Sequence, residues 1–200
     1  MHFILPEYGK LLVATGMKAG PNSFPHVTTI EIVNLLGPEQ TCLKLPDFPK
    51  TVQEATGSLF QGQPIICGNE GASYGCGGAC STVCYILFAN DTTKWHQLSS
   101  MPQKRYGARA VSYPLSGDLY PNLATFLLTF GTDDSQNYIM PDEYLSETGW
   151  KQLNTEKIYN PDTYRYSHCA TRIDENRIMI IGGDRVPDFE EGKQRGKGRA

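Results

Sequence analysis

Pro64-Ile65-Ile66-Cys67-Gly68 is a short, β-rich apolar run that ends in glycine, and the chain repeats this kind of run three more times. The other runs are Leu11–Gly16, Phe126–Gly131 and Ile178–Gly183. Their glycines at 16, 68, 131 and 182 are separated by 52, 63 and 51 residues. This spacing predicts a protein built from repeats of about 50 residues.

A second landmark recurs with the same period. The segment Trp95-His96-Gln97-Leu98-Ser99-Ser100-Met101-Pro102 has counterparts at 42–49 and at 150–153. Two independent landmarks with one period indicate an internal repeat rather than a chance similarity.

Within each repeat the sequence predicts β-strands. Residues 81–88 are β-branched and aromatic, and residues 108–113 alternate loosely between apolar and polar side chains. Turn-forming residues such as Asn90-Asp91 and Asn160-Pro161-Asp162 separate these stretches. No segment carries a long apolar stripe with helical spacing. The expected fold class is therefore all-β, with four short strands in each unit.

A more specific pattern joins the landmarks in the second unit, which has Gly68, Phe88, Trp95, Leu98 and Met101-Pro102 in this order. The fourth unit opens with Arg165-Tyr166-Ser167-His168 and runs to Gly182-Gly183. In these motifs the chain resembles the kelch repeat. The resemblance implies a kelch-type β-propeller, of the kind also found in galactose oxidase, with about three and a half four-stranded blades in an incomplete ring. The blades are expected at about 11–49, 52–102, 105–154 and 165–186, between an N-terminal segment 1–10 and a basic, glycine-rich disordered tail 187–200.

The repeat landmarks have structural roles. Glycine at the end of a strand permits a positive φ or a close backbone approach, and tryptophan can fill the wedge between neighbouring units while its N–H reaches a partner. A packed structural role is also expected for His168. The expected structural residues are Gly16, Gly68, Gly131, Gly182, Gly183, Trp95 and Trp150.

The chain has six cysteines, and four of them lie between positions 67 and 84. The equal spacing of Cys76, Cys80 and Cys84 fits neither common zinc sites nor common iron–sulfur runs, so no metal is expected. Free thiols and disulfides both remain open. Closure of Cys67–Cys76 or Cys76–Cys80 is sterically possible, because Cys67 ends the second strand and the other two follow in the next loop. One sequon, Asn90-Asp91-Thr92, could accept a glycan if the chain is secreted.

Charge and composition argue against several classes of function. Eighteen basic and 21 acidic side chains give a net charge of -3, so there is no electrostatic reason to expect nucleic acid or an anionic membrane as partner. No signal peptide or transmembrane run is seen, and the compartment stays open, with a cytoplasmic location slightly favoured over secretion. No paired carboxylates, Ser–His–Asp set or phosphate-binding glycine loop stands out. We therefore expect neither catalysis nor a cofactor.

The expected function is that of a protein-interaction module. In an antiparallel meander the turns alternate between the two ends, so the loops after each second strand share one face with the connections between units. In kelch proteins that resemble this chain, that face commonly holds a protein or peptide partner. Arginine and tyrosine are enriched at interface hot spots. The candidate partner-binding residues are Asn69, Glu70, Arg105, Tyr106, Asp133, Asp134, Arg165, Tyr166, Asp184 and Arg185.

The alternative is an extracellular propeller domain with galactose oxidase-like or carbohydrate-binding activity. For either function, a ring of six 50-residue blades needs about 300 residues. The 200 residues here predict a fragment, or an open arc that associates with itself through unpaired strand edges.

Overall fold

The computed structural model describes residues 2–5, 10–17, 26–34, 42–52, 55–68, 81–115, 123–129, 131, 142–146, 148–153, 167–174 and 177–183. All regular elements within these residues are β-strands, and every strand pairing among them is antiparallel. The expected all-β class is therefore confirmed. Within the same residues, no helix is long and apolar enough to cross a membrane.

The strands form three four-stranded sheets and a hairpin, in which each strand pairs with its neighbour in sequence. The first sheet holds β1 (His2–Leu5), β2 (Lys10–Met17), β3 (His26–Asn34) and β4 (Cys42–Lys44). The second sheet holds β5 (Thr56–Phe60), β6 (Gln63–Cys67), β7 (Cys84–Phe88) and β8 (Asp91–Gln97). The third sheet holds β9 (Arg109–Leu115), β10 (Leu123–Thr129), β11 (Asp142–Ser146) and β12 (Gly149–Leu153). The C-terminal hairpin holds β13 (Cys169–Arg172) and β14 (Ile178–Ile181).

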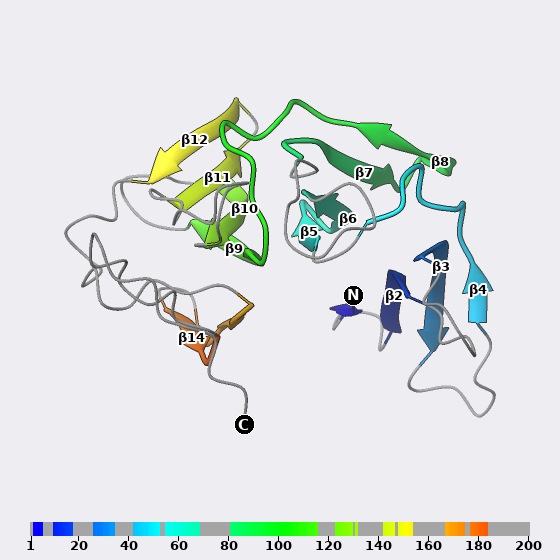
Figure 1. The fold of residues 1–200 in the computed structure, drawn as a ribbon, viewed down its shortest axis with the longest axis horizontal. Helices are drawn as coiled ribbons and strands as arrows, with labels where there is room; N and C mark the ends of the chain where they lie inside the picture. Colours follow the sequence, from blue (N-terminus) through cyan, green and yellow to red (C-terminus); the bar gives the residue numbers. More distant parts are fainter. Residues whose placement is uncertain are drawn as a thin grey trace, which may run out of the picture.

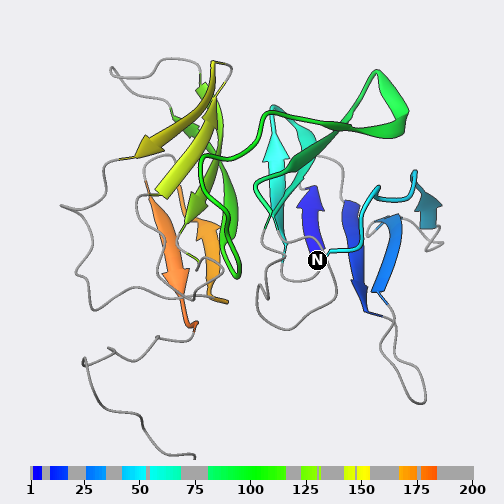
Figure 2. The ribbon, with the colours of Figure 1, turned by 45° about the horizontal axis from the view of Figure 1, so that its top comes forward.

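The sheets and the hairpin follow one another around an arc (Figure 1). The first strand of each sheet lies toward the inside of the arc, and the last strand lies toward the outside. β5 contacts β9, and β9 contacts β13, so the inner strands of successive units are neighbours. A view turned by 45° shows the same succession (Figure 2). The described strands thus trace an arc and not a closed ring.

Two details of the first sheet differ from the sequence-based expectation. Residues 2–5, which the repeat pattern leaves in an N-terminal segment, form β1 and pair with β2. This run is too short to show a period, and it carries none of the repeat landmarks. Gly16 does not end its strand: β2 continues to Met17, and Gly16 lies at a register shift in the pairing with β3. A glycine at such an irregularity is common, because it tolerates local bending of the strand.

The first and second sheets enclose a hydrophobic cluster. It contains Leu12, Ala14 and Ile30 from the first sheet, Ile66, Tyr85, Leu87 and Trp95 from the second, and Phe48, Val52 and Ala55 from the connection. The ring of Phe48 meets the rings of Tyr85 and Trp95 edge to face, with centroids 5.2 Å apart in both pairs. Trp95 is therefore a core residue, as the sequence predicts.

A second cluster joins the second and third sheets. Its buried members are Phe60, Ile65, Cys67, Cys84, Ile86, Met101 and Leu145, with Trp150 packed against them. Neighbouring residues on one strand point to opposite faces, so Ile65 belongs to this cluster while Ile66 belongs to the first. The central strands β6 and β7 contribute buried side chains to both clusters, which explains why residues 64–67 and 84–88 form continuous apolar runs.

Backbone hydrogen bonds after the fourth strand repeat from sheet to sheet. After β4, the amide of Leu45 donates to the carbonyl of Ile30 at 3.1 Å. After β8, the amide of Leu98 donates to the carbonyl of Cys84 at 2.9 Å. Phe48 and Met101 make the next bond of each series, to Thr28 and Thr82. The second landmark of the repeat therefore folds in the same way in both units.

Candidate partner-binding face

Glycines at the ends of β6 and β10 lie against the connection that leads into the third sheet. Gly68 has φ +84°, and a Cβ there would stand 3.2 Å from the carbonyl oxygen of Arg105. Gly131 has φ +105°, and a Cβ there would stand 2.9 Å from the carbonyl oxygen of Tyr106. Only glycine satisfies both the positive φ and the close approach. The two second-strand ends therefore meet at residues 105–108.

The opening of the C-terminal hairpin reaches the same connection. The amide of Ser167 donates a hydrogen bond of 2.9 Å to the carbonyl oxygen of Gly107. We call residues 105–108, with Gly68, Gly131 and Ser167, the junction. Second-strand ends and unit openings thus share one end of the sheets in the described part of the chain, as the meander argument predicts. Gly68 and Gly131, which directly precede segments 69–80 and 132–141 in the sequence, both lie at this end.

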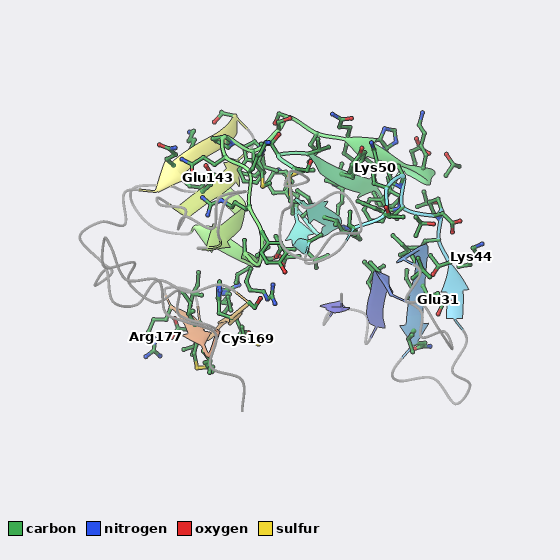
Figure 3. All side chains as sticks on the ribbon, viewed as in Figure 1. Glu31, Lys44, Lys50, Glu143, Cys169 and Arg177 are labelled. Carbon is green, nitrogen blue, oxygen red and sulfur yellow. A yellow bond between two sulfur atoms is a disulfide. The ribbon has the colours of Figure 1, made fainter. Side chains whose placement is uncertain are left out.

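Arg105 is not available to a partner. It is 2% exposed, and its Nε donates to Oε2 of Glu143 over 3.1 Å. Glu143 lies on β11, inside the third sheet, and is fully buried (Figure 3). Arg105 therefore does not lie on a contact surface, contrary to the expectation. A buried charge needs a buried counter-charge, and Glu143 supplies it.

Among the other expected contact residues, Tyr106 alone lies in the described part of the chain. Tyr106 is half-buried at the junction. The remaining expected contact residues lie outside the described residues: Asn69, Glu70, Asp133, Asp134, Arg165, Tyr166, Asp184 and Arg185. His168, expected to be a packed structural residue, is fully buried.

The inner strands of the second and third sheets are joined by a serine pair that the sequence analysis missed. The hydroxyls of Ser58 on β5 and Ser112 on β9 lie 2.7 Å apart. The amide of Leu59 donates to the Ser112 hydroxyl at 2.8 Å, and the amide of Ser112 donates to the Ser58 hydroxyl at 3.1 Å. Ser112 also donates to the carbonyl of Leu59. Small side chains at these two positions let the inner strands approach closely. Ser58 and Ser112 are 54 residues apart, about one repeat period, so an alignment of the repeats could have identified the pair.

Cys67 forms a disulfide, but its partner is Cys84 and not Cys76. The two residues face each other across β6 and β7, with Cα atoms 4.1 Å apart. The amide of Gly68 donates to the carbonyl of Val83, so this is a non-hydrogen-bonded pair, the position at which opposite side chains come closest. Cys76 and Cys80 lie outside the described residues. Cys169 is exposed and is not disulfide-bonded (Figure 3).

A polar cluster occupies the β7–β8 hairpin. Oδ1 of Asp91 accepts from the amide and the hydroxyl of Thr93, and Oδ2 lies 2.7 Å from Nε2 of His96. These hydrogen bonds, first those from Thr93 and then that from His96, lower the pKa of Asp91 to about 2. The ring of His96 also lies 4.9 Å from that of Phe88. The contacts fix a turn, and the described residues contain no group of three or more His, Cys, Asp or Glu that could hold a metal.

Comparison with known proteins gives a likeness of fold. No protein-family model matches the chain, and no curated protein matches it. A solved structure described as "Structure of YjhT" is similar over 76% of this chain, with a TM-score of 0.55 and 13% sequence identity. The chain spans 45% of the length of that structure. At this identity the similarity concerns the arrangement of strands alone.

Proposed function

We propose that the chain is an arc of a kelch-type β-propeller and binds a protein or peptide partner through the loops at the junction end. The observation that carries the proposal is the junction itself, where two second-strand ends and the opening of the C-terminal hairpin meet residues 105–108. Loops that leave rigid strands at one end can present a shared surface without disturbing the core. The proposal includes no catalytic step, cofactor, nucleic acid or membrane.

The arc geometry supports the propeller interpretation. Successive four-stranded meanders pack face to face, with their first strands innermost. Tryptophans at equivalent positions also bond backward: Trp95 Nε1 donates to Pro46 O, and Trp150 Nε1 donates to Ser99 O. A regular inter-sheet contact of this kind is what radial repetition requires.

Affinity capture from an extract of the source cells tests the partner-binding face. The double variant Arg165→Ala/Tyr166→Ala should lose the partner that the wild-type chain recovers. Lys151→Ala is the control, because Lys151 is an exposed cation on the outer strand β12. Arg105 is unsuitable as a probe, since its removal would leave Glu143 buried without this counter-charge. Equal recovery by a folded double variant and by the wild type would remove the opening of the fourth unit from the proposed binding face.

We further propose that the C-terminal hairpin associates with a second copy of the chain. One face of the hairpin exposes Ile173, Met179 and Ile181, which are 53%, 39% and 53% exposed. Aligning Gly182 with Gly68 places Met179 and Ile181 at the positions of Ile65 and Cys67, which are 0% and 1% exposed against the following sheet. Exposed apolar faces of this kind favour association.

Light scattering over a range of concentrations tests this contact. The wild-type chain should show a concentration-dependent increase in mass, and Met179→Lys/Ile181→Lys should stay monomeric. Gln97→Lys, at an exposed site on β8, is the charge control and should associate like the wild type. A monomeric wild type at every concentration would refute self-association while leaving the loop proposal untouched.

One observation favours part of the alternative function. The Cys67–Cys84 disulfide is typical of proteins that fold in an oxidising compartment, as an extracellular carbohydrate-binding or galactose oxidase-like domain would. Binding to a glycan array and copper analysis of the purified protein test its two branches. Negative results in both would leave the interaction module as the function.

A further inference from the structure

Asn90 lies at the tip of the β7–β8 hairpin, and its side chain is exposed. The turn consists of Ala89 and Asn90, with Phe88 paired to Asp91 across it. Figure 2 shows this hairpin projecting from the body of the sheets. Asn90 is thus surrounded by solvent on a short, well-defined turn.

The residues that follow Asn90 complete an N-x-Thr sequon, the only one in the chain. Thr92 is exposed on β8, so the second recognition residue is on the surface as well. The middle residue, Asp91, is turned toward Thr93 and His96 by three hydrogen bonds. Its carboxylate is therefore engaged within the hairpin.

A separate observation concerns the compartment. The Cys67–Cys84 bridge closes across two central strands of the same sheet, and both cysteines are buried. Disulfides form and persist in the endoplasmic reticulum and outside the cell, and are rare in the cytosol. Asparagine glycosylation belongs to the same secretory route.

The glycan would lie away from the junction. The amide of Gly68 bonds the carbonyl of Val83, next to the start of β7, and β7 ends four residues after Cys84, at Phe88. The amide of Ala89 bonds Oε1 of Gln63, which places this turn beside the β5–β6 turn at the other end of the sheet. A sugar chain on Asn90 therefore leaves the loop end open to a partner.

We propose that Asn90 carries an N-linked glycan and that the protein matures in the secretory pathway. In this step the amide nitrogen of Asn90 displaces the diphosphate of a lipid-linked oligosaccharide: the N–glycosyl bond forms, the bond from the sugar to the phosphate breaks, the lipid diphosphate leaves, and the amide loses one proton. It adds a bulky, solvated group at the outer end of the second sheet.

Peptide mapping of the protein from its own cells tests the proposal. Alkylation without reductant should leave Cys67 and Cys84 unlabelled and joined to each other by their disulfide. Peptide N-glycosidase should remove the mass of one glycan and convert Asn90 to Asp. When the variants are expressed through a eukaryotic secretory pathway, Asn90→Gln and Thr92→Ala should lose the glycan, and Thr92→Ser should keep it.

Two outcomes would overturn the proposal. The first is an unmodified Asn90 in native protein whose Cys67–Cys84 bridge is intact. The second is alkylation of both Cys67 and Cys84 in the native, unreduced protein, which would indicate a reducing compartment. Partner capture by Asn90→Gln is expected to match the wild type, so failure of the loop proposal can be distinguished from failure of this one.

Discussion

Trp95 on β8 donates a hydrogen bond of 3.1 Å from its indole Nε1 to the carbonyl oxygen of Pro46, which belongs to the connection after the first sheet. One unit later, Trp150 bonds the carbonyl oxygen of Ser99 at 3.0 Å. Each tryptophan therefore links its own sheet to the segment that follows the previous sheet. The two tryptophan donors are separated by about one repeat, and so are the two carbonyl acceptors.

Trp95→Phe should lower the free energy of unfolding by about 2 kcal/mol, from one lost hydrogen bond and a smaller buried ring. Trp95 is 7% exposed and contacts Phe48, so both losses fall in the core. Trp150→Phe is the comparison, and should lose only about 1 kcal/mol because its hydrogen bond is exposed. Urea unfolding measures both values. A loss at Trp150 equal to or above that at Trp95 would contradict this account of the linkage.

Much of the strand pattern could be predicted from the sequence. Gly68, Gly131 and Gly182 adopt positive φ where the apolar runs end, and Trp95 is buried between two sheets. These features are local or periodic, so a single sequence reveals them. Strand β1 could not be predicted in the same way, because four residues before Pro6 show no period and need β2 to become a strand.

The candidate site was less predictable. From sequence alone, a glutamate on a strand is expected to face solvent. The contact between Glu143 and Arg105 is evident only in the folded chain. The partner of Cys67 depends on the register between β6 and β7, which loop spacing does not give. Long-range contacts of this kind depend on how strands align, and sequence spacing alone carries no information about alignment.

Removing one side of the Arg105–Glu143 pair should destabilise the protein strongly. Glu143→Leu or Arg105→Met should each lower the free energy of unfolding by about 3–5 kcal/mol, because the remaining charge stays buried. Arg105→Met/Glu143→Leu removes both charges and should lose less than either single variant. A double-mutant cycle by urea unfolding measures the coupling. Additive losses would show that the two side chains act independently.

The Asp91 turn should make stability depend on pH in the acidic range. The pKa of Asp91 is lowered from 3.8 to about 2 in the folded chain, so folding favours the carboxylate. The contribution is present above pH 3.8 and is lost as pH falls toward 2. Thr93→Val removes the hydroxyl donor and should raise this pKa, as carboxyl NMR titration can measure. An unchanged pKa in Thr93→Val would assign the shift to other contacts.

Gly131→Ala should destabilise the protein more than Gly62→Ala, although both glycines have positive φ, +105° and +75°. At Gly62 no atom lies within 4 Å of the added Cβ, so the loss should be about 1 kcal/mol, for the left-handed backbone alone. At Gly131 the Cβ would also lie 2.9 Å from the Tyr106 carbonyl oxygen and 3.1 Å from Cβ of Ala108, so the junction must shift. We expect a loss of about 3 kcal/mol or more there, from strain at a site that packing holds in place. Thermal unfolding of the two variants measures the difference. Equal losses would show that the junction is loose enough to absorb a methyl group, and would weaken the argument that it holds the loops in a fixed arrangement.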